Sequence, residues 1–226
     1  MRIGPRTHHS PWRPLLLAVL AAVGLGLAGR VAVHAGASLP HGRAIANVGH
    51  TAVALGAPWL AVAWAVGAFA GSRMRGAAGG AAALVLGTGA WYLLTVVAAA
   101  SGWAAAHYAV PVAAAWGVVS LGAGALFGFA GAAWRDGTLL ARGASIALLG
   151  GALAGEALLL MQEWSGRAAN AVLSLEMAAG VAVVLLARRR VPLGVTLGLF
   201  AITTVGVAQI EGVVREALRL AGWGGP

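Results

Sequence analysis

The chain has 226 residues, of which 60% are hydrophobic and only 9% are charged, and its formal net charge is +9. Soluble domains carry roughly 25% charged residues, so this composition excludes an ordinary soluble domain and indicates a membrane protein. The basic side chains are all arginine and lie between apolar stretches, which is typical of membrane topology rather than of a nucleic-acid-binding face.

Seven stretches are apolar enough to cross a membrane, since a span needs about 20 such residues. In chain order they cover 14–36, 53–71, 78–99, 109–132, 143–162, 169–187 and 192–213. We therefore predict an all-α, polytopic transmembrane helix bundle of about seven spans, with six as the alternative count. As domains we expect a basic cytoplasmic leader over 1–13, a single transmembrane bundle over 14–213 and an amphipathic C-terminal tail over 214–226.

The arginines also predict an orientation. If seven spans alternate, one side holds Arg43, Arg167, Arg215 and Arg219, and the other side holds Arg2, Arg6, Arg13, Arg73, Arg75, Arg135, Arg142, Arg188, Arg189 and Arg190. The positive-inside rule then places the N-terminus in the cytoplasm and the C-terminus outside. We expect a multi-pass protein of the cell inner (plasma) membrane.

Two glutamates, Glu156 and Glu176, each lie inside a predicted span. A carboxyl group at bilayer depth costs at least about 2.5 kcal/mol, so it is rarely found there without a partner or a task. The predicted depths place both acids toward the outer leaflet, together with Arg30, Trp91 and Tyr92. We take these five as candidate ligand-binding or buried polar residues. A structural hydrogen bond, or a pair with Arg30, is the open alternative for the two acids, and helix packing is the alternative for the two aromatics.

The other charged residues predict surface interactions. Glu163 with Arg167, and Glu211 with Arg215, have the i,i+4 spacing of solvated helical pairs. The second pair lies on a segment that we interpret as an amphipathic helix along the membrane interface. The chain has no cysteine, and its histidines show no metal-binding spacing, so we expect no metal and no cofactor.

Several short motifs carry a family resemblance. They are Ala46-Asn47-Val48-Gly49, Gly56 to Ala63, Gly67-Ala68, Trp91-Tyr92, Gly131 to Arg135, Gly155 to Leu158 and Leu175-Glu176. Together they resemble a family of actinobacterial multi-pass membrane proteins of unknown function, over about residues 14–190. The resemblance implies two aromatics in the place of Trp91-Tyr92 and an acid in the place of Glu156. It implies an architecture but no activity.

Three functions remain open. The first is the binding or transport of a small molecule through an outer-leaflet polar cavity, in a chain similar in size to the substrate-binding components of energy-coupling-factor transporters. Because no ATP-binding motif is present, transporter partner subunits would supply the energy. The second is an integral membrane enzyme that acts on a prenyl or terpenoid substrate by acid catalysis, with Glu156 and Glu176 as acid and counter-charge. The third is a structural or regulatory subunit. The expected partners are membrane lipid and a small-molecule ligand, not nucleic acid.

Overall fold

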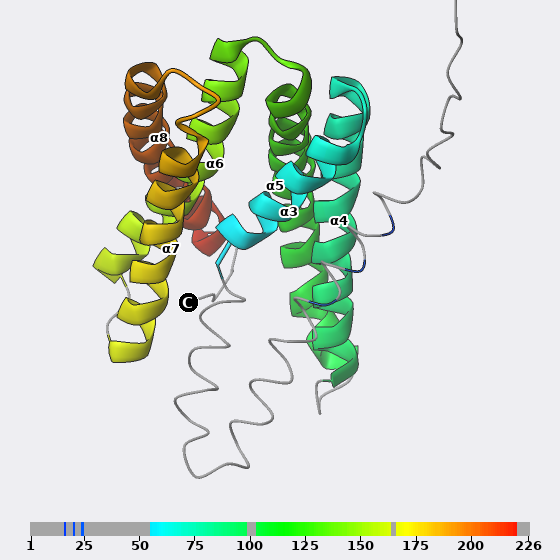
Figure 1. Ribbon diagram of the computed structural model, residues 1–226. Coiled ribbons are helices and arrows are strands. Elements are labelled where there is room, and N and C mark those ends of the chain that lie inside the picture. The colour runs from blue at the N-terminus through cyan, green and yellow to red at the C-terminus, as the bar shows by residue number, and fades with distance from the viewer. Residues whose placement is uncertain are drawn as a thin grey trace, which may run out of the picture.

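The computed structural model describes residues 55–98, 103–163 and 166–220, together with Leu16, Leu20 and Gly24. Six α-helices occupy the three ranges, in which no strand is present: α3 (Ala57–Phe69), α4 (Arg73–Ala98), α5 (Trp103–Asp136), α6 (Leu139–Glu163), α7 (Arg167–Ala187) and α8 (Leu193–Leu220) (Figure 1). Five of them, α4 to α8, are long and apolar enough to cross a membrane. The prediction of an all-helical fold is therefore confirmed for the described part of the chain, and its five long apolar helices are compatible with a membrane protein.

The second predicted span, 53–71, is wrong in its length, because α3 has only 13 residues. At 1.5 Å per residue this helix measures about 20 Å, whereas the hydrocarbon core is about 30 Å thick. Pro58 lies in its first turn, where a missing N–H costs least. Gly71 follows its end with a φ of 72°, a left-handed conformation that glycine adopts readily. Since 14–36 lies almost wholly outside the described residues, a count of seven spans is not confirmed.

The six helices form two groups. In one group α3, α4 and α5 pack against one another, and in the other α6 packs on both α7 and α8. Contacts of α6 with α5 and α3 join the two groups, which stand side by side in Figure 1. Large apolar side chains such as Val97 and Leu186 are 73% and 81% exposed, which suits an outer surface that faces lipid.

Close backbone contacts hold α3, α4 and α5 together. We define the glycine seam as Gly67 in α3, Gly76 and Gly80 in α4, and Gly124 and Gly128 in α5. A Cβ atom added at any of these five positions would come closer than 3.0 Å to backbone atoms of a neighbouring helix. Small residues at membrane interfaces let backbones approach in this way, and van der Waals contact then stabilises the pair.

The described arginines gather mainly at one end of the bundle, which we call the basic end. It carries Arg73, Arg75, Arg135, Arg142, Arg188, Arg189 and Arg190, at the starts of α4 and α6, at the end of α5 and in the α7–α8 connection. The α5–α6 and α7–α8 connections lie together at the top of Figure 1. In the described residues of the opposite end, Arg167 and Arg219 are accompanied by Glu163 and Glu216. The arginines on the two sides of the bundle are thus unequal in number.

Candidate functional site

Glu156 lies on α6, is only 1% exposed, and holds the start of α3. Its Oε1 accepts a hydrogen bond from the backbone N–H of Gly56 at 2.6 Å, and its Oε2 accepts one from Ala57 at 2.5 Å. The first N–H groups of a helix have no intrahelical hydrogen-bond acceptor, and inside a bilayer there is no bulk water to accept their hydrogen bonds. The carboxylate satisfies two such donors and places negative charge at the positive end of the helix dipole.

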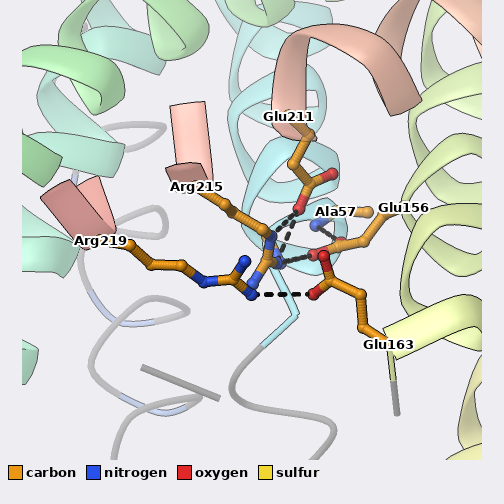
Figure 2. Close-up of polar contacts among 7 residues, drawn as sticks. Ala57, Glu156, Glu163, Glu211, Arg215 and Arg219 are labelled. Carbon is orange, nitrogen blue, oxygen red and sulfur yellow. Dashed lines mark hydrogen bonds and ion pairs between the residues drawn. The ribbon is translucent and has the colours of Figure 1, made fainter. Parts of the chain in front are cut away.

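Arg215 lies on α8 and joins this contact from the other side, with a side chain that is 3% exposed. Its Nη2 lies 3.0 Å from Oε1 of Glu156. Its Nε and Nη2 also donate to Oε1 of Glu211, at 2.8 and 2.7 Å. Figure 2 shows Arg215 between the two carboxylates. Three helices, α3, α6 and α8, therefore meet at one buried ion pair.

A second ion pair lies beside the first and is more exposed. Arg219 Nη2 is 3.2 Å from Glu163 Oε2, and the two side chains are 42% and 29% exposed (Figure 2). Glu163 follows Glu156 by seven residues on α6, and Arg219 follows Arg215 by four residues on α8. These spacings put each pair of like residues on one helical face. The ends of α6 and α8 are thus joined twice, once inside the bundle and once near its surface.

Glu176 lies on α7 and is buried, with 6% of the residue exposed. Neither of its carboxylate oxygens has a hydrogen-bond partner among the described residues. The Glu156 carboxyl group lies near enough to act on Glu176 as a hydrogen-bonding group, although outside full hydrogen-bond geometry, and Glu211 and Arg215 act on Glu176 electrostatically. We call Glu156, Glu176, Glu211 and Arg215 the polar cluster. It contains three carboxyl groups and one guanidinium group.

Apolar side chains close one side of the polar cluster. Leu173, one turn before Glu176 on α7, is fully buried against Ala157 and Leu160 of α6 and against Leu55. Leu55 immediately precedes the Gly56 N–H that Glu156 binds. The carboxyl groups therefore lie next to a surrounding of low polarity, in which an uncompensated charge costs more than it does in water.

Two of the five candidate residues, Glu156 and Glu176, come together in the structure. Trp91 and Tyr92 are half-buried on α4, in the other group of helices. Arg30 lies outside the described residues, so its pairing with an acid stays a prediction. Within the described ranges, no three His, Asp or Glu side chains are arranged to hold a metal ion.

Two predicted surface pairs need correction. Glu211 and Arg215 do form an ion pair, but Arg215 is buried and also reaches Glu156. Glu163 was predicted to pair with Arg167, but within the described residues its ion-pair partner is Arg219. The i,i+4 spacing considers only residues that are close in sequence, and it therefore missed both ion pairs between α6 and α8. The available signal was that Arg215 follows a predicted span without a Gly or Pro break, which favours one continuous helix.

Comparison with known proteins identifies a family but no activity. No curated protein and no solved structure matches the chain. A family model described as a family of unknown function, DUF6518, matches residues 5–215. This match agrees with the predicted resemblance to a family of unknown function, whereas the actinobacterial origin stays a prediction. The chain belongs to the family of unknown function DUF6518.

Proposed function

We propose that this protein binds, and in its membrane transports, a small molecule whose cationic or hydrogen-bond-donating group contacts Glu176. The observation that carries the proposal is the buried carboxyl group of Glu176, whose two oxygens have no hydrogen-bond partner among the described residues. A buried polar group without a partner costs about 1–3 kcal/mol, and a charged one costs more. A ligand that supplies N–H donors or positive charge removes this cost.

The charges of the polar cluster support the same proposal. Among the described residues the cluster has one cation, Arg215, and that guanidinium already binds both Glu156 and Glu211. Three carboxyl groups beside one guanidinium leave the cluster short of positive charge or of hydrogen-bond donors. An ammonium or amidine group on a ligand has the complementary chemistry.

The two buried glutamates have different tasks in this proposal. Both oxygens of Glu156 are engaged by backbone N–H groups, and one is also engaged by Arg215, which favours a structural role. A general acid needs a proton that it can deliver to a substrate, so these contacts disfavour Glu156 as the acid of a membrane enzyme. Glu176, without such contacts among the described residues, is the residue that we assign to the ligand.

The position of the cluster favours capture from the outside. Glu156 lies seven residues before the end of α6, and Arg215 lies five residues before the end of α8, both remote from the basic end. We assign the basic end to the cytoplasm by the positive-inside rule, with the plasma membrane as the location. The polar cluster then lies in the outer half of the bundle.

Native mass spectrometry of the full chain, released in a mild detergent, tests the proposal. We expect wild-type protein to carry a small molecule that Glu176→Gln loses. Glu216→Gln is the matched control, because Glu216 is an exposed glutamate on α8 and should retain the molecule. An adduct that survives in Glu176→Gln would contradict the assignment. Wild-type protein that is free of any adduct, and that small organic cations do not stabilise against heat, would contradict ligand binding itself.

A further inference from the structure

A surface pocket of about 320 Å³ opens at the basic end. It is lined by Trp134, Arg135 and Asp136 at the end of α5, by Arg142 in α6, and by Arg190 in the α7–α8 connection. We call it the basic pocket. It lies at the end of the bundle opposite to the polar cluster, so the proposed function does not involve it.

Among the described residues, the arginines of the basic pocket form no ion pair. Arg135 donates to the carbonyl oxygen of Ala68 at 3.1 Å, and Arg142 donates to the carbonyl oxygen of Arg135 at 2.9 Å. Nε of Arg142 is buried and has no hydrogen-bond partner among the described residues. None of the ion pairs between described residues includes Asp136 or an arginine of the pocket. With three arginines and one aspartate, the pocket has an excess of two positive charges.

The missing partner is an anion with several acceptor oxygens. Guanidinium groups present N–H donors in a planar fork, which matches the oxygens of a phosphate group. The pocket has donors from two helices and a connecting segment, so a single phosphate group is able to contact more than one arginine. The buried Nε of Arg142 adds an unpaired donor beside this site, among the described residues.

The surroundings of the pocket indicate where such a phosphate comes from. Leu139 and Leu140, at the start of α6, are 59% and 61% exposed, and Leu186, near the end of α7, is 81% exposed. These leucines are close in sequence to the arginines of the pocket, and they belong to the apolar outer surface of the bundle. Trp134 is half-buried in the pocket, and tryptophan is enriched at the level of lipid headgroups. A phospholipid is able to place its phosphate in the pocket and its acyl chains on the leucines.

We propose that the basic pocket binds a phosphate group presented by the headgroup of an anionic phospholipid. Basic pockets between transmembrane helices suit anionic headgroups, because lipid charge and arginine charge meet where water is partly excluded. Phosphatidylglycerol is the probe, because it combines a phosphate with a net negative charge. Phosphatidylcholine and inorganic phosphate separate the anionic lipid from a zwitterionic lipid and from the free ion.

The experiment measures lipid adducts on the purified full chain by native mass spectrometry, at equal concentrations of phosphatidylglycerol or phosphatidylcholine. Arg190→Gln is the main variant, because Arg190 is exposed, whereas Arg142 also holds a backbone carbonyl. Arg189→Gln is the matched control, since Arg189 is an exposed arginine in the same connection that does not line the pocket. We expect Arg190→Gln to weaken phosphatidylglycerol binding about fivefold. Arg189→Gln should change it by less than about twofold, because its charge is exposed and screened.

Three results would overturn the proposal or part of it. Equal losses in Arg190→Gln and Arg189→Gln would show a general attraction of anionic lipid to the basic end, without a pocket. Equal binding of phosphatidylcholine and phosphatidylglycerol would show that the pocket does not require a headgroup with a net negative charge. Stabilisation against heat by inorganic phosphate, lost in Arg190→Gln and without any lipid adduct, would retain the phosphate chemistry and overturn the lipid as its source. None of these results depends on Glu176.

Discussion

The two ends of α3 are held by opposite means. In its second half Gly67 meets Gly128 of α5, where the glycine seam brings backbones into contact without any charged group. At its start the carboxylate of Glu156 binds two backbone N–H groups and Arg215. In lipid, apolar side chains gain little by leaving their surroundings, so close packing and polar bonds become the main stabilising interactions. A helix too short to span uses both.

The difference predicts two kinds of sensitivity. The glycine seam has no room for an added atom, because each new Cβ would meet a neighbouring backbone. The polar cluster is sensitive to the loss of charge, because a buried ion left alone is strongly unfavourable. The following substitutions examine this contrast in order of the expected effect.

Glu156→Gln should have the largest effect on stability. It removes the charge that Arg215 and the start of α3 share, and breaking a buried ion pair costs about 3–5 kcal/mol. The free energy of unfolding in mixed detergent micelles measures the loss. Glu216→Gln, on an exposed pair of α8, should change it by less than about 1 kcal/mol. Equal values for the two variants would contradict the anchoring role of Glu156.

Gly128→Ala should have the next largest effect. The new methyl group would meet the backbone of Gly76 in α4, and such overpacking costs about 1–3 kcal/mol. Gly122→Ala is the matched control on the same helix, because no atom lies within 4 Å of its added Cβ. Alanine has the higher helix propensity by up to about 1 kcal/mol, so this control should be neutral or stabilising. Thermal unfolding of both variants checks the seam, and similar melting temperatures would argue against it.

Arg219→Gln should have the smallest effect. Its pair with Glu163 is partly exposed, and such pairs contribute about 0.2–1 kcal/mol. A double-mutant cycle with Glu163→Gln measures the coupling, which should weaken as salt is added. If this coupling energy were as large as that between Glu156 and Arg215, solvent exposure would not explain a difference in strength between the two ion pairs.

Some elements of the fold follow directly from the sequence. The apolar stretches that became α4 to α8 were recognisable from length and hydropathy, because each must satisfy its own backbone inside lipid. The length of α3 was harder to predict, since its apolar run continues to both sides of the helix. Gly56, Pro58 and Gly71 marked its ends, but the same residues also occur within longer spans.

The candidate site, too, was predictable from the sequence only in part. The sequence alone determined that Glu156 and Glu176 stand inside apolar stretches, and it predicted that each needs a partner or a task, because charge in an apolar run is costly wherever the helices pack. Only the tertiary structure decided that Glu156 is occupied by the start of α3 and by Arg215, while Glu176 has no hydrogen-bond partner among the described residues. Arg215 is 59 residues from Glu156, so their contact depends on how α6 and α8 pack, and no local spacing encodes that packing.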